Sequence, residues 1–142
     1  MIFSKACEYG IRAAVYIAYT SSRNEKAGIQ EISEEIDSPP HFTAKILQAL
    51  ARKKVISSIK GPSGGYFMNN PASIDLVEII RAIDGNGLFS ACVMGLKTCS
   101  DSRPCPMHDQ MKPIRTQLLI EFGKRSVLEL MLDYEQKKYF LK

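Results

Sequence analysis

The chain has no tryptophan and only two histidines, His41 and His108. The periodicity of the sequence brings neither histidine together with a serine nucleophile, and it forms no paired-carboxylate arrangement. Acid–base and nucleophilic catalysis depend on such arrangements. An enzyme is therefore not predicted.

Long apolar runs are also missing. No stretch reaches the roughly 18 residues that a membrane span needs, and the first five residues lack the basic-then-apolar order of a signal peptide. We expect a cytoplasmic protein with no membrane partner, in a compartment where thiols stay reduced. The 142 residues, 45% of them hydrophobic, suffice for one core with an appended helical arm.

Acidic residues are absent from the segment 38–74, although the net charge of the whole chain is only +4. The segment contains one histidine and five basic residues: His41, Lys45, Arg52, Lys53, Lys54 and Lys60. A polyanion such as DNA is attracted to a surface of this kind. The alternative is a solvated surface that happens to lack acids.

The first half of the chain predicts three helices and a hairpin. Apolar residues at helical spacing predict helices over residues 5–20, 29–36 and 40–53. Two short strand-like runs follow, over residues 55–59 and 66–68, and a Gly/Pro-rich turn from Lys60 to Gly65 separates them. Helix, helix, helix and hairpin in this order form a winged helix, whose helix-turn-helix places its second helix in the major groove.

The second half predicts helices on both sides of an irregular loop. A helix from Leu76 is closed by Gly85, where the cysteine loop (Gly85–Pro106) begins. An apolar seam then predicts a helix that pairs with another helix, through Met107, Met111, Ile114, Leu118 and Phe122. Ser126 and Glu129 form a capping-box pattern for a last helix that runs to about Tyr139.

The fold class that follows is mainly α with a small β-hairpin wing. We assign residues 1–71 to a winged-helix DNA-binding domain. Residues 72–142 form the connecting helix, the cysteine loop and the dimerisation helices.

Three cysteines lie in the loop as Cys92-x6-Cys99-x5-Cys105, and His108 follows three residues later. Thiolates are soft ligands that suit iron and zinc. Three cysteines and one histidine can also form a structural zinc site. A further alternative is that the three cysteines are unrelated loop thiols, because the sequence contains no CxxC pair. Cys7 lies outside the triad and is expected to be a small buried residue of the first helix.

Three segments resemble the Rrf2 family of bacterial regulators, which includes IscR, NsrR and CymR. The most specific is residues 57–66, where the family typically has Arg-Gly-Pro-x-Gly-Gly-Tyr and this chain has Lys60 in place of the arginine. Residues 4–13 resemble the opening helix of the family, and residues 79–85 resemble the segment before its cluster loop. The resemblance implies a homodimer that places two winged helices on a palindromic site in double-stranded DNA.

The resemblance also implies an iron–sulfur cluster on Cys92, Cys99 and Cys105. Two residues are candidates for the fourth ligand. A histidine three residues after the last cysteine completes a 2Fe-2S site in IscR-like members, which corresponds to His108. An acidic residue of the partner subunit completes a 4Fe-4S site in NsrR-like members, which corresponds to Glu8.

The DNA contacts are expected to divide between phosphates and base edges. Base edges are assigned to His41, Thr43 and Ala44. Members of the family often read Tyr-Leu-Glu at the start of this helix, where this chain reads Phe42-Thr43-Ala44. Phosphates are assigned to three basic side chains and to the wing: Lys45, Arg52, Lys60, Gly61, Ser63, Gly64, Gly65 and Tyr66. The alternative for Arg52 is that its charge stabilises the C-terminus of the helix and contacts no phosphate.

The hypothesis is a homodimeric transcription regulator that senses redox state, nitric oxide or iron–sulfur supply through its cluster. One alternative is a regulator of the same fold without a cluster, switched by thiol oxidation or by a protein partner. A second alternative is a zinc-binding interaction module with feeble affinity for DNA.

Overall fold

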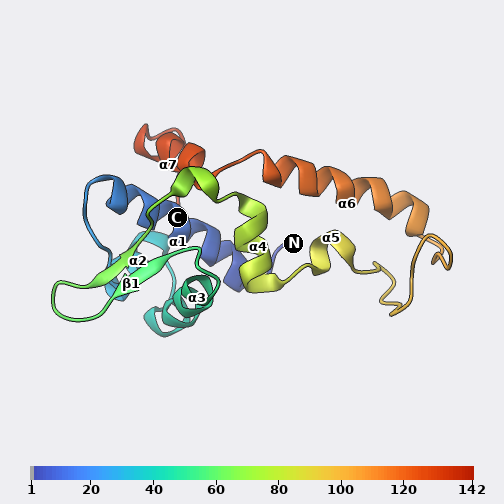
Figure 1. Cartoon of the computed structure of the whole chain (residues 1–142), viewed down its shortest axis with the longest axis horizontal. Helices are drawn as coiled ribbons and strands as arrows, with labels where there is room; N and C mark the ends of the chain where they lie inside the picture. The colour runs from blue at the N-terminus through green and yellow to red at the C-terminus, as the bar shows by residue number, and fades with distance from the viewer. Residues whose placement is uncertain (1) are drawn as a thin grey trace.

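A winged-helix body and a projecting helical arm make up the molecule (Figure 1). The computed structural model describes residues 2–142. The body contains α1, α2, α3, the β1–β2 hairpin, α4 and α7. In the arm, the long helix α6 (His108–Gly123) runs away from the body, and the short helix α5 (Gly87–Ser90) packs against it. The cysteine loop lies at the far end of the arm.

Helix α1 (Lys5–Ser22) is the centre of the body and contacts α2, α3, α4 and α7. The Ser4 side chain caps it by accepting a hydrogen bond of 3.0 Å from the Cys7 N–H. Small side chains at Ala13, Ala14 and Ala18 are buried, so neighbouring helices approach α1 closely. The predicted helix is confirmed and extends two residues beyond Thr20.

Helices α2 (Ile29–Ile36) and α3 (Pro40–Arg52) form the helix-turn-helix. Asp37 adopts a left-handed conformation, with φ 53°, and ends α2. Pro40 begins α3, because the first helical position needs no N–H donor. Both helices bury their apolar faces in the core, through Ile32, Ile36, Ile46, Leu47 and Leu50.

The wing is an antiparallel hairpin of β1 (Ser57–Ile59) and β2 (Gly65–Phe67), with Ser58 opposite Tyr66. Tyr66 also exchanges backbone hydrogen bonds of 2.8 and 3.0 Å with Ala27, which fastens the base of the wing to the body. A Cβ on Gly64 would lie 2.0 Å from the Ile59 carbonyl oxygen, so only glycine fits this turn.

The structure corrects the expectation that Thr43 faces outward to base edges. Its side chain is fully buried, and its hydroxyl donates at 3.0 Å to the Pro39 carbonyl oxygen and lies 3.0 Å from Ser38 Oγ. The misplacement has a simple cause, since position 43 is three residues before the core residue Ile46 on the same helix face. Thr43 fixes the first turn of α3 instead.

Two boundaries after the wing also differ from expectation. The cysteine loop, predicted without regular structure, contains α5, whose four residues are too few to give a period. Helix α7 (Val127–Glu135) has the predicted capping box but ends before Tyr139. Lys137 is left-handed, with φ 59°, and the Lys138 N–H donates to the Asp133 carbonyl, which closes the helix.

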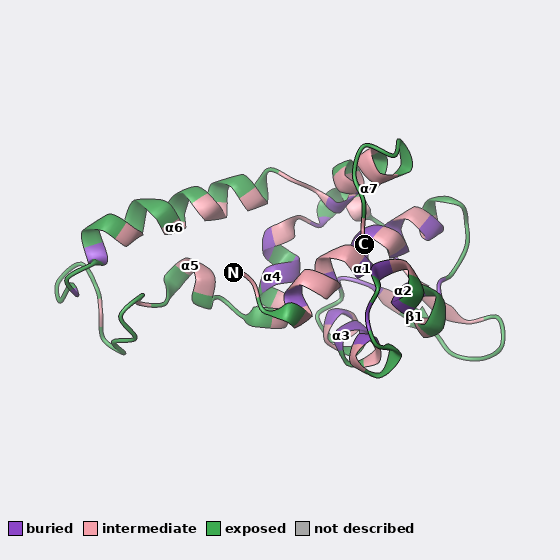
Figure 2. Ribbon diagram, turned by 180° about the vertical axis from the view of Figure 1, so that it is seen from behind, coloured by how far each residue is buried: buried purple, intermediate pink, exposed green. Residues whose placement is uncertain are grey.

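Helix α4 (Leu76–Asp84) follows a 3-10 turn (Pro71–Ser73) and leads from the body to the arm. The arm is far more exposed than the body (Figure 2). Apolar side chains of α6 lie open in the single chain, and 50% of Ile114 and 45% of Ile120 are exposed. Among residues 2–142, no helix combines the length and the apolar character of a membrane span.

The buried hydroxyl of Thr43 yields a stability prediction. Thr43→Val keeps the shape but leaves the buried Ser38 hydroxyl without its partner, and the described residues contain no unpartnered buried side-chain N or O atom. We expect the free energy of unfolding to fall by about 1–3 kcal/mol, measured in urea. Thr43→Ser and the exposed variant His41→Ala serve as controls. If the Thr43→Val protein were as stable as wild type and preferred a different DNA sequence, Thr43 would contact bases after all, which would contradict its structural role.

Candidate metal centre and nucleic-acid interface

The cysteine loop brings three distant thiols to one point. The Sγ atoms of Cys92, Cys99 and Cys105 all lie within 4.8 Å of one another. Cys105 is buried and the other two are half-buried. The Cys105 N–H also donates a hydrogen bond of 3.4 Å to Cys99 Sγ. Convergent sulfur atoms with N–H donors around them are the chemistry of an iron–sulfur or zinc site.

His108 lies at the edge of this set, at the first position of α6. Its Nδ1 atom is 3.3 Å from Cys99 Sγ, and its Nε2 atom is 2.8 Å from Asp101 Oδ1. The side chain is only 9% exposed. A nitrogen ligand is therefore at hand beside the three sulfurs.

Asp101 connects His108 to α6. Both of its carboxylate oxygens accept hydrogen bonds of 2.8 Å from Lys112 Nζ. The hydrogen bond from Lys112, followed by that from His108, lowers the pKa of Asp101 below its usual range. Asp101 is accordingly a carboxylate at neutral pH.

The thiols differ in acidity. The backbone N–H of Leu96 is the main influence that lowers the pKa of Cys92 to about 7. At Cys99, the Cys105 N–H favours the thiolate, but burial and the neighbouring thiols outweigh it, and the pKa is raised. Burial, and then the charge of Asp84, raise the pKa of Cys7 to about 12. Cys92 thus ionises at a lower pH than Cys99 or Cys7.

The other two candidates on α1 lie outside the thiol set. Cys7 is fully buried in the core, as expected for a small apolar residue. Glu8 lies in the first turn of α1 and forms an ion pair of 3.3 Å with Lys5. Its carboxylate is not part of the group of atoms within 4.8 Å that the thiols form in one chain.

The outer face of α3 forms the candidate reading surface. His41, Lys45, Gln48 and Arg52 are all exposed and recur at helical spacing, while Ala44 is half-buried. Gln48 was missing from the predicted contact residues. Gln48 follows Lys45 by three residues and precedes Arg52 by four, and this helical spacing could have identified it from the sequence.

The wing extends this surface. Lys60, Gly61 and Ser63 are exposed at its tip, and Gly64 and Gly65 are half-buried in the turn. Tyr66 is half-buried because its ring packs against the core. The predicted wing residues therefore divide into an exposed tip and a structural base.

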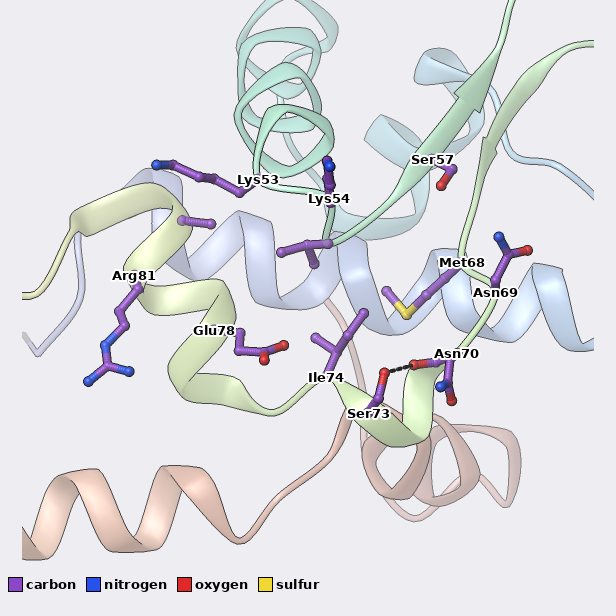
Figure 3. Close-up of a pocket in the computed structure, with 12 residues that line it drawn as sticks. Lys53, Lys54, Ser57, Met68, Asn69, Asn70, Ser73, Ile74, Glu78 and Arg81 are labelled. Atoms are coloured by element: carbon purple, nitrogen blue, oxygen red, sulfur yellow. Dashed lines mark hydrogen bonds between the residues drawn. The ribbon is translucent and has the colours of Figure 1, made fainter.

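A separate cavity of about 560 Å³ lies behind the hairpin, between the end of α3 and α4 (Figure 3). Lys53 and Lys54 line one side, and Glu78 and Arg81 on α4 line the other. Burial, and then Asp75, raise the pKa of Glu78. No cysteine or histidine lines this cavity, so it is distinct from the candidate metal centre.

Comparison with known proteins identifies the family. Residues 3–133 match the model of the Rrf2 family, described as an iron-dependent transcriptional regulator. The chain belongs to the Rrf2 family. This confirms the predicted family and its function class, a transcriptional regulator.

The Rrf2 relatives cover almost the whole chain. A protein of Aquifex aeolicus, named as an HTH-type transcriptional regulator, is 28% identical over 143 residues, which are 99% of this chain and 97% of that protein. The structure of IscR from T. potens aligns with a TM-score of 0.74 at 16% identity, covering 96% of this chain and 90% of its own. CymR, the global cysteine regulator of B. subtilis, aligns at 0.72 with 18% identity, covering 91% and 95%. These likenesses confirm the winged-helix fold.

The unequal thiols of this Rrf2 protein predict an order of labelling. In metal-free, reduced protein, Cys92 should react first with iodoacetamide, and its rate should rise as the pH passes about 7, where its thiolate forms. Cys7 should stay unlabelled until the protein unfolds. Mass spectrometry of peptides from timed samples measures both. Cys92→Ser serves as the control that removes the fast phase, and labelling of Cys99 before Cys92 would contradict the assignment.

Proposed function

We propose that this Rrf2-family chain is a homodimeric DNA-binding regulator whose affinity for its operator depends on an iron–sulfur cluster. The cluster would be held by Cys92, Cys99, Cys105 and His108. The observation that carries the proposal is the convergence of the three thiols within 4.8 Å. The proposed role is regulation, in line with the transcriptional regulators among its relatives.

The donor set fits an iron–sulfur cluster. Three soft sulfur ligands suit iron, and Cys92, with its lowered pKa, gives up its proton readily. His108 is favoured over Glu8 as the fourth ligand because His108 Nδ1 lies beside Cys99 in the same chain. When bound, such a cluster supplies a centre that responds to oxidation, nitric oxide or iron supply. The similarity to IscR proteins is compatible with a cluster at these thiols.

The position of the cysteine loop explains how the site would affect DNA binding. The loop joins α4, which packs on α1 and α3 in the body, to α6 in the arm. Arg115 of α6 donates a hydrogen bond to the Ala91 carbonyl next to Cys92, so loop and arm are connected. The arm would then have two states, one in which the loop is ordered and fixes its position, and one in which the loop is not ordered. The cluster would shift the equilibrium between these two states because it binds them with different affinities.

The arm is also the proposed dimer contact. Ile114 and Ile120 on α6 are about half exposed in the single chain. Large exposed apolar side chains along one helix are typical of helix pairing. Two bodies joined through their arms would present two α3 helices to a palindromic site in double-stranded DNA.

One further candidate function has a specific observation in its favour. Cys92 ionises at about pH 7 and lies within 4.8 Å of two other thiols. With hydrogen peroxide as the oxidant, the Cys92 thiolate would attack one peroxide oxygen, break the O–O bond, release hydroxide and become a sulfenic acid. The thiol of Cys99 or Cys105 would then attack the sulfenic sulfur, form the disulfide and release water. The same loop would then be switched by a covalent bond instead of a cluster.

The cluster proposal predicts iron and sulfide in equal amounts on protein purified without oxygen, together with a brown colour. Cys105→Ser should lose the cluster because it removes the buried ligand. Operator fragments selected from random duplexes should bind holo and apo protein with different affinities at the same salt. The holo sample should sediment as a dimer. Colourless anaerobic protein, or equal holo and apo affinities, would contradict the proposal.

Lys60 tests the nucleic-acid surface. Lys60→Ala should weaken binding to random-sequence duplex DNA and reduce the slope of log affinity against log salt by about one, because one phosphate contact is lost. Fluorescence anisotropy at several salt concentrations measures the slope. Lys97→Ala, an exposed lysine of the cysteine loop, removes the same charge away from the wing and is the matched control. Equal slopes for both variants and wild type would exclude Lys60 from the interface.

A further inference from the structure

His108 is held between a thiol and a carboxylate, one at each ring nitrogen. Nδ1 faces Cys99 Sγ at 3.3 Å, and Nε2 faces Asp101 Oδ1 at 2.8 Å. A neutral imidazole carries one proton, and a carboxylate only accepts hydrogen bonds. The proton therefore lies on Nε2, which donates to Asp101, and the lone pair of Nδ1 points to the thiol side.

The carboxylate is itself fixed from two directions. Lys112, one turn after His108 on α6, donates to both Asp101 oxygens at 2.8 Å. Paired backbone hydrogen bonds of 3.1 and 3.2 Å between Ser100 and Arg103 close the turn that carries Asp101. The Asp101 side chain remains 71% exposed and borders a cavity of about 400 Å³ between α5 and α6. Asp101 is thus ordered and solvated, and the ring that it contacts is buried.

We infer that Asp101, held by Lys112, is a positioning residue that fixes His108 as the Nε2–H tautomer and presents Nδ1 as the ligand atom beside Cys99. This inference rests on the proposed ligand set. It goes further by naming the ligating atom of the histidine and the residue that selects it. Asp101 does not touch the metal position in this arrangement, since its oxygen lies at the opposite nitrogen of the ring.

The arrangement has a measurable consequence for metal affinity. A carboxylate that accepts from the distal N–H of a histidine raises the basicity of the ligand nitrogen and removes its rotational freedom. Loss of such a partner typically weakens metal binding about 10- to 100-fold. Asp109 provides a matched control, because it follows His108 directly, is exposed, and forms no side-chain hydrogen bond or ion pair within residues 2–142.

The tautomer is tested first, on reduced metal-free protein. Long-range proton–nitrogen NMR correlations distinguish Nε2–H from Nδ1–H, and the chain has only two histidines to assign. Wild type and Asp109→Ala should show His108 as Nε2–H, and Asp101→Ala should show a mixture. Asp101→Asn should keep the wild-type form, since its amide oxygen still accepts from Nε2–H. His41 should be unchanged throughout. A mixture in wild type, or no change in Asp101→Ala, overturns the inference.

Zn²⁺ serves as the probe for the ligand set, titrated against a chromogenic chelator. Asp101→Ala should bind Zn²⁺ about 10- to 100-fold more weakly than wild type, and Asp109→Ala should match wild type. Equal affinities for the two alanine variants overturn the positioning role. Iron and sulfide analysis of wild type judges the cluster separately. If wild type carries a cluster but Asp101→Ala and Asp109→Ala bind Zn²⁺ equally well, only the role of Asp101 is contradicted. If wild type carries no cluster but Asp101→Ala changes the His108 tautomer, only the proposed function is contradicted.

Discussion

The close approach of α4 to α1 at Gly10 is the constraint on which the architecture depends. A Cβ at this position would lie 2.1 Å from Ile83 Cδ1 and 3.4 Å from Ile46 Cγ2. Helices α1, α3 and α4 therefore meet at Gly10, where an added Cβ would force the Ile83 side chain to shift. Because α4 leads into the cysteine loop, this contact joins the arm to α3, the helix of the proposed reading surface. A change in the position of α4 would reach α3 through packing alone.

The two ends of the arm are held by different forces. Near the body, Phe122 packs against Phe3 with ring centroids 5.4 Å apart, and backbone hydrogen bonds join Arg125 to Leu76 and Val127 to Ile74. At the far end, polar contacts of exposed groups and the three thiols take the place of a core. Surface ion pairs such as Lys112–Asp101 contribute little to stability, because solvent screens the two charges. The far end is consequently held by weaker contacts than the end near the body.

Much of this arrangement could be predicted from the sequence. The helices, the wing and the capping box at Ser126 follow from local periodicity and turn chemistry, and the structure confirms them. Thr43 was misplaced although it lies on the face of α3 that buries Ile46, because a threonine is usually exposed unless its hydroxyl finds a partner, here the Pro39 carbonyl. Asp101 was missed for a different reason. It lies in an aperiodic loop, and its relation to His108 and Lys112 exists only after the chain folds back on α6.

The magnitudes favour a metal centre as the element that sets the state of the loop. Moving a two-state equilibrium from 1:99 to 99:1 needs about 5.5 kcal/mol of differential binding. Structural zinc in small domains supplies about 10–16 kcal/mol. If the proposed ligation by Cys92, Cys99, Cys105 and His108 favoured one position of the arm by even part of such an energy, it would suffice to shift the arm. The contact between α4 and α3 would then carry the shift to α3.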